Sequence, residues 1–186
     1  MTTGSDRPSS ERGPARAARG GRASASGGSD RRSTDEMRGS VQGGSRRRAR
    51  EFALQGLYQW LLAGTAPSTI RAQLTEAGGF AKCDAKFFDG LWHGVTAEFD
   101  TLVSAFAPYL DRPPAELSPI EKGVLAIGAW ELLRQPDIPY RVAINEAVEL
   151  AKSYGGTDGY KYVNGVLDRL AAATRAAEIG ASRSTT

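Results

Sequence analysis

The chain has 186 residues, of which 40% are apolar and 24% are charged, an ordinary balance for one folded domain with a flanking tail. Its only cysteine, Cys83, excludes an internal disulfide and fits a reducing compartment. No apolar run opens the chain or reaches the ~20 residues of a membrane span, so we expect a cytoplasmic protein that does not enter a membrane.

Charge is distributed unevenly along the chain. Residues 1–50 contain 12 basic and 5 acidic residues, a net charge of +7, whereas the remainder of the chain has a net charge of −4. This asymmetry indicates a polyanionic partner that is engaged at the N-terminal end.

Residues 1–44 contain no Leu, Ile, Phe, Tyr or Trp and are rich in Gly, Ser and Arg. Such a segment cannot bury enough apolar surface to offset the entropy lost on ordering, which predicts a disordered basic extension. Met37 is an alternative start that the sequence leaves open.

Apolar residues recur at helical spacing through residues 45–175, and no segment alternates with the period of a strand. The pattern predicts an all-α bundle of about six helices, near 45–63, 68–77, 84–110, 118–134, 141–154 and 158–174. Ser45 is the expected N-cap of the first helix, and Ser118 with Glu121 forms a capping box for the fourth. The fourth helix is apolar nearly all round, which predicts the most buried position. Residues 176–186 are expected to form a flexible tail.

Four arginines, Arg46, Arg47, Arg48 and Arg50, stand at the predicted start of the first helix. The positive end of the helix dipole disfavours cations there by up to ~0.3–1 kcal/mol each. A bound phosphate would reverse that penalty, because arginine side chains and free helix amides both bind anions. The alternative is a solvated basic run at the end of a tail.

A second candidate surface lies on the last predicted helix. Val163 belongs to the core stripe, so Lys161, Tyr162 and Asn164 are expected to face outward or sideways. An exposed tyrosine beside a lysine and an amide is typical of single-stranded nucleic-acid binding. Burial of the Tyr162 ring against the first helix is an equal alternative.

Catalytic patterns are absent from the sequence. His93 is the only histidine, Cys83 has no identifiable base, and the Gly-rich stretch 155–159 has neither phosphate-loop pattern. We therefore expect no enzyme, no metal site and no cofactor.

The final inward-facing residue of the fifth helix is predicted to be Tyr154.

Three stretches, 46–60, 139–152 and 161–168, resemble the NusB family of transcription antitermination factors, and the resemblance runs in order over residues 46–170. It implies two helical subdomains that bind single-stranded boxA RNA jointly with NusE, a small-subunit ribosomal protein, and thereby help RNA polymerase pass terminators in ribosomal RNA operons. The implied RNA contacts are Arg46, Arg47, Arg48, Arg50, Asp158, Lys161, Tyr162 and Asn164. The implied NusE contacts are Tyr58 and Glu121. Tyr162 stands where the family often has Phe, which preserves stacking.

Two alternatives remain beside an RNA-binding factor. A helical protein–protein adaptor would use the arginine run only for solubility. A domain serving an RNA methyltransferase, as in fusions that contain NusB-like domains, is disfavoured because the chain has no room for a catalytic domain and no cofactor loop. The sequence does not choose between a monomer and a homodimer, nor does it give the RNA sequence preferred.

Overall fold

The computed structural model describes the backbone of residues 30–183 and the side chains of residues 43–181. Within that range every regular element is a helix, which confirms the predicted all-α fold. Most of the predicted basic extension and the last three residues lie outside the described residues. No described helix combines the length and the apolarity needed to cross a membrane.

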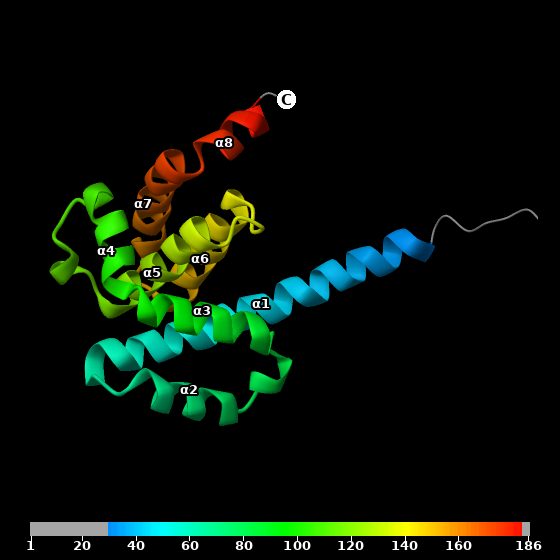
Figure 1. Ribbon diagram of the computed structural model, residues 1–186, viewed down its shortest axis with the longest axis horizontal. Coiled ribbons are helices and arrows are strands. Elements are labelled where there is room, and N and C mark those ends of the chain that lie inside the picture. The colour runs from blue at the N-terminus through cyan, green and yellow to red at the C-terminus, as the bar shows by residue number, and fades with distance from the viewer. Residues whose placement is uncertain (1–29, 184–186) are drawn as a thin grey trace, which may run out of the picture.

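Helix α1 (Asp30–Ala63) is much longer than predicted, and its N-terminal part projects from the body (Figure 1). The predicted N-cap at Ser45 is wrong, because Ser45 lies inside this helix. A helix already anchored in the core by Leu54 and Leu57 extends at one hydrogen bond per residue, without a new nucleation step. The sequence also has no proline between Pro14 and Pro67 to stop it.

Two short helices pack along the C-terminal half of α1. They are α2 (Pro67–Glu76) and α3 (Ala85–Ala97), joined through the 3-10 turn η1 (Phe80–Lys82). Gly64 ends α1 with a φ of 65°, a left-handed conformation that glycine adopts at helix C-termini without steric cost. The buried Ile70 and Phe88 bring α2 and α3 into the core.

The single helix predicted over residues 84–110 is wrong. The segment is divided into α3, α4 (Phe99–Phe106) and η2 (Ala107–Tyr109), and η3 (Pro114–Glu116) follows. The break falls at Glu98, where a carboxylate oxygen accepts a hydrogen bond of 2.6 Å from Arg134. The change of direction also places Phe99 edge-on against Trp60, with ring centres 5.0 Å apart. Contacts distant in sequence therefore break this helix.

Helix α5 (Pro119–Arg134) is the centre of the fold, as predicted. Every residue from Gly123 to Leu132 is buried. The predicted capping box is confirmed: the Ser118 hydroxyl accepts from the Glu121 amide at 3.2 Å, and the Glu121 carboxylate accepts from the Ser118 amide at 3.0 Å. At Gly128 an added Cβ would lie 2.6 Å from Leu167, so glycine allows the close approach of α7.

The C-terminal part consists of α6 (Tyr140–Tyr154), α7 (Gly159–Thr174) and α8 (Ala176–Arg183). The predicted flexible tail is wrong over residues 176–183. Arg175 donates to the carbonyls of Leu132 and Gln135 at 2.7 and 2.8 Å, which ties the end of α7 to the end of α5. Glu178 accepts from the Tyr140 amide at 2.9 Å, which fixes α8 beside α6.

The helices form two packed groups, in agreement with the two subdomains that the sequence implied. Helices α1, α2 and α3 make one group, and α4 to α8 make the other around α5 (Figure 1). The contact between α1 and α5 joins them. The arginine run on α1 therefore lies beside the junction.

Candidate nucleic-acid interface

The four arginines of the run lie in the interior of α1, not at its start. Because α1 begins at Asp30, the free amides and the positive end of the helix are remote from Arg46 and its neighbours. The anion site predicted from the helix dipole is therefore wrong, and the surroundings of each arginine decide whether it can bind a phosphate.

Arg50 points into the protein and is only 3% exposed. Its guanidinium donates two hydrogen bonds to Glu131, at 2.6 and 3.1 Å, and a third to Glu146 at 3.4 Å. The ring of Phe87 lies 5.0 Å from the guanidinium carbon. This group is a buried structural ion pair between α1 and α5, so we leave Arg50 out of the candidate interface.

Arg46 and Arg47 are paired but remain partly exposed. Arg46 lies 3.5 Å from the Asp84 carboxylate and packs over Phe87 at 5.2 Å. Arg47 donates to Glu146 at 3.2 and 3.3 Å, and this contact raises the pKa of Arg47. Both side chains can reach a phosphate only in competition with a neighbouring carboxylate.

Arg48 differs from the other three. It makes no hydrogen bond or ion pair with any residue that the structure describes. Its guanidinium lies at the border of a cavity, close to the turn at Gly79. Arg48 is thus the arginine of the run whose charge is not paired with a carboxylate among the described residues.

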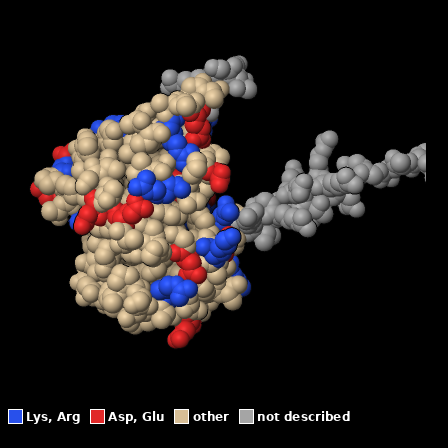
Figure 2. Space-filling model, in the orientation of Figure 1, with Lys and Arg blue, Asp and Glu red and all other residues tan. Residues whose placement is uncertain are grey.

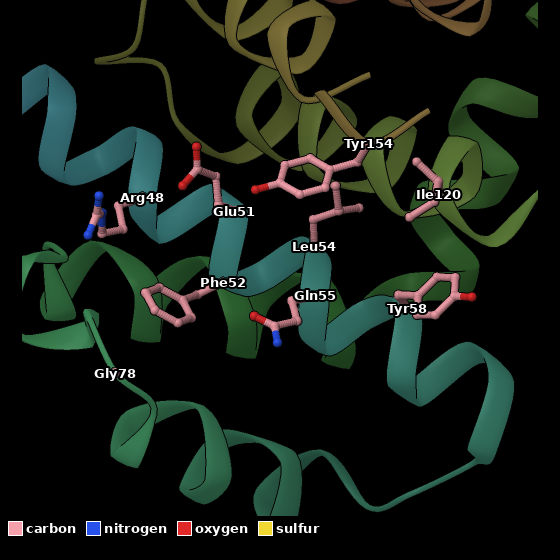
Figure 3. Close-up of a pocket in the computed structure, with 9 residues that line it drawn as sticks. All are labelled: Arg48, Glu51, Phe52, Leu54, Gln55, Tyr58, Gly78, Ile120 and Tyr154. Atoms are coloured by element: carbon pink, nitrogen blue, oxygen red, sulfur yellow. The ribbon is translucent and has the colours of Figure 1, made fainter. Parts of the chain in front are cut away.

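The cavity beside Arg48 has a volume of about 420 Å³ and follows α1 (Figure 3). Helix α1 contributes most of its lining, through Arg48, Glu51, Phe52, Leu54, Gln55 and Tyr58. Gly78, Ile120 and Tyr154 complete it from the α2–η1 turn, α5 and α6. The cavity is therefore a largely apolar cleft with a few polar groups on its walls.

Tyr154 is the residue of this cavity that sequence reasoning misplaced. The helical period of α6 predicted an inward side chain, but Tyr154 is 49% exposed. It occupies the last turn of the helix, and its ring extends toward Glu51 on α1 (Figure 3). Partial burial, together with the nearby Glu51, raises the pKa of Tyr154, so its hydroxyl stays protonated and can donate.

The second candidate surface predicted from the sequence lies at the start of α7. Lys161 pairs with Asp158 at 2.8 Å, and the Asn164 amide donates to Asp168 at 2.8 Å. Because Lys161 and Asp158 are well exposed, their pair opens at little cost. Tyr154 precedes the short α6–α7 connection that leads to Asp158, so it lies between the two predicted groups along the chain.

Tyr162 is half-buried, packs against the core and lies beside the loop after α4, a position between the predicted outward and buried alternatives. The guanidinium carbon of Arg112 lies 4.8 Å from its ring centre, and burial raises the pKa of Tyr162. Arg112 is thus a further cation at this surface, which only the fold brings next to Tyr162.

Of the two predicted partner contacts, Tyr58 lines the cavity and Glu121 directly follows the lining residue Ile120 in the chain. Tyr58 is 43% exposed, and Leu62, one turn later on α1, is 59% exposed. The carboxylate of Glu121 serves the capping box. An apolar patch at the end of α1 therefore adjoins Glu121.

The described residues contain no cluster of side chains that would hold a metal ion. Burial raises the pKa of Cys83 to about 11, which keeps its thiol protonated and unreactive at neutral pH.

The visible face of the body carries mixed charges, and basic side chains gather beside the place where α1 leaves it (Figure 2). These features define a class: an all-α protein in which cations and a half-exposed tyrosine lie beside a largely apolar cleft.

Comparisons with known proteins define the family. Residues 47–172 match the sequence model of the NusB family. The transcription antitermination protein NusB of Ralstonia pickettii is 60% identical over 139 residues, 75% of this chain and 90% of that protein. The NusB of Bordetella pertussis is 57% identical over 142 residues, 74% of this chain and 92% of its own length.

Solved structures agree with this result. A crystal form of T. maritima NusB aligns with a TM-score of 0.61 at 30% identity, covering 68% of this chain and 89% of that one. A structure of NusB and NusE in complex with double-stranded RNA aligns with a TM-score of 0.61 over 69% of this chain and 97% of that one; at 24% identity it supports the fold alone. The chain belongs to the NusB family of transcription antitermination factors.

Proposed function

We propose that this chain binds single-stranded boxA-type RNA jointly with the ribosomal protein NusE, and thereby promotes processive transcription of ribosomal RNA operons. It contacts RNA polymerase only through that assembly and acts in the cytoplasm as an adaptor, without a catalytic step. The observation that carries the proposal is the guanidinium of Arg48, which has no carboxylate partner among the described residues and lines a cavity together with Tyr154.

The RNA surface in this proposal runs from α1 to α7. Arg46, Arg47 and Arg48 supply charge on α1, and Lys161 supplies it on α7. Tyr162 and Asn164 add a ring and an amide, and Asp158 accepts hydrogen bonds. Phosphate contacts of this kind give affinity, while ring and amide contacts select bases.

The partner surface in this proposal is the end of α1 together with Glu121. Tyr58 and Leu62 expose apolar area side by side, which favours a protein partner over solvent. The capping bond of Glu121 uses one carboxylate oxygen, Oε2, so the other oxygen remains available to a partner.

A gel-shift titration tests the proposal. The full chain is titrated against a boxA-type strand with and without NusE, beside an Arg48→Ala/Lys161→Ala variant. We expect the variant to bind the strand at least about ten-fold more weakly at unchanged helical content. The matched control is Arg71→Ala/Lys86→Ala, which removes two charges from α2 and α3 and leaves binding unchanged.

The second candidate function is a protein-only adaptor, which the exposed Tyr58 and Leu62 favour. In that case NusE binds the chain, RNA never joins the complex, and the Arg48→Ala/Lys161→Ala variant behaves as the wild type. The same titration therefore separates the two functions.

A further inference from the structure

The cavity along α1 is large enough to hold a small ligand. Its volume of about 420 Å³ lies in the range of pockets that enclose small molecules. The wall formed by Leu54 and Ile120 is apolar, and the ring of Tyr154 lies across from α1 (Figure 3). A flat heterocycle can enter and lie against that ring.

About half of the Tyr154 residue is exposed to solvent. It is one of four large hydrophobic residues that the described surface exposes, and it lines the cavity together with Tyr58. A stacked base would cover the ring, and stacking of this kind contributes about 1–3 kcal/mol per base. The position of Tyr154 therefore suits a base that has left the stack of its strand.

Arg48 supplies the charge that a nucleotide needs. Its guanidinium borders the cavity and has no carboxylate partner among the described residues, whereas Arg46, Arg47 and Arg50 each have one. A base inside the cavity would bring its own phosphate to the mouth. An arginine fork binds that phosphate well.

Two polar side chains on α1 decide which base fits. Glu51 offers a carboxylate, which only accepts hydrogen bonds, and Gln55 offers an amide that both donates and accepts. Guanine, adenine and cytosine present amino groups that donate to a carboxylate. Uracil presents one ring N–H between two carbonyl oxygens, and those oxygens are repelled by Glu51.

We propose that this cavity receives one unstacked base of the bound RNA strand, stacked on Tyr154, with its phosphate on Arg48 and with Glu51 selecting a base that carries an amino group. This inference rests on the proposed function, since it adds a base-specific site to the RNA surface. It concerns Glu51, Gln55 and Tyr154, none of which the sequence assigned to RNA.

An abasic scan tests the cavity. A boxA-type strand is made with one base removed at each position in turn, and its affinity for the full chain is measured by fluorescence anisotropy. We expect one position at which base removal weakens binding about ten-fold to wild type but less than about two-fold to Tyr154→Ala. Tyr154→Phe keeps the ring and is expected to behave as wild type.

A second arm tests the base preference at that position. Replacement of the native base with uracil is expected to weaken wild-type binding by about five-fold. Glu51→Gln, which removes the charge and keeps the shape, is expected to reduce that difference to less than about two-fold. Val142→Ala removes another exposed hydrophobic side chain, at the far end of α6, and leaves every affinity unchanged.

Each result bears on one part of the proposal. Wild-type binding with no position that depends on Tyr154 overturns the base site and leaves the proposed function intact. Loss of NusE binding in Tyr154→Ala, at unchanged RNA affinity, overturns it as well and makes the cavity a protein-docking site. Unchanged discrimination in Glu51→Gln overturns the role of Glu51. Absence of RNA binding by wild type, with or without NusE, overturns the proposed function itself.

Discussion

Two faces of α1 use the same type of side chain in opposite ways. On the inner face, Arg50 is buried and forms three hydrogen bonds to two carboxylates. On the cavity face, Arg48 lies two residues earlier in the chain and has no such bond among the described residues. The surroundings of each arginine, and not its place in a basic run, separate a stabilising residue from one that can bind RNA.

The largest expected effect is the loss of stability when Arg50, on the inner face of α1, is replaced. Arg50→Ala leaves Glu131 buried without its partner, so we expect a loss of about 3–5 kcal/mol in the free energy of unfolding, measured by urea denaturation. The paired replacement Arg50→Met/Glu131→Leu removes both charges and is expected to recover most of that loss. A loss below about 1 kcal/mol in Arg50→Ala would show that the ion pair is not structural.

Arg175 extends the same principle to the end of α5. Arg175→Ala removes the donor of hydrogen bonds to the carbonyls of Leu132 and Gln135 and to Oε2 of Glu178. We expect a loss of about 1–3 kcal/mol in unfolding free energy with unchanged RNA affinity. Thermal denaturation and a gel shift of the same sample check both parts. Weaker RNA binding at full stability would contradict a purely structural role.

Substitutions on the cavity face of α1 are expected to have smaller effects, and these effects fall on RNA affinity and not on the unfolding free energy. Arg48→Ala is expected to weaken RNA binding by about ten-fold, or about 1.4 kcal/mol, and to leave the unfolding free energy within about 0.5 kcal/mol of wild type. Anisotropy and urea denaturation give the two values. A destabilised Arg48→Ala protein would mean that this guanidinium has a partner inside the fold.

Arg47 gives the smallest effect. Because Glu146 already neutralises part of its charge, Arg47→Ala is expected to weaken RNA binding by only about two- to three-fold. Anisotropy under the same conditions as for Arg48→Ala checks the order of the two variants. The reverse order would show that RNA displaces Glu146 and uses Arg47 as its main contact.

The sequence predicted the parts of the fold that depend on local patterns. The buried face of α5 follows from apolar spacing, and its start follows from the Ser118–Glu121 capping box. The break at Glu98 and the docking of α8 depend on Arg134, Glu178 and the α5 carbonyls, which are distant in the sequence. Local patterns carry no signal for such contacts.

The candidate site shows the same division. The sequence pattern identified the arginine run and Tyr162 as candidate binding residues, but it did not predict which side chains would surround them. Three of the arginines form ion pairs with carboxylates from other parts of the chain, namely Asp84, Glu131 and Glu146. Arg112, in a loop, packs over the ring of Tyr162. Tyr154 was assigned to the core because the helical period ignores the open space beyond a last turn.

The salt dependence of RNA binding tests the central claim most directly. If Arg46, Arg47, Arg48 and Lys161 each neutralise one phosphate of a single strand, log affinity falls against log salt with a slope near −3, at about −0.7 for each contact. Arg48→Ala is then expected to reduce the magnitude of the slope by about 0.7. A slope that is the same in wild type and Arg48→Ala would contradict the claim that Arg48 binds the RNA backbone.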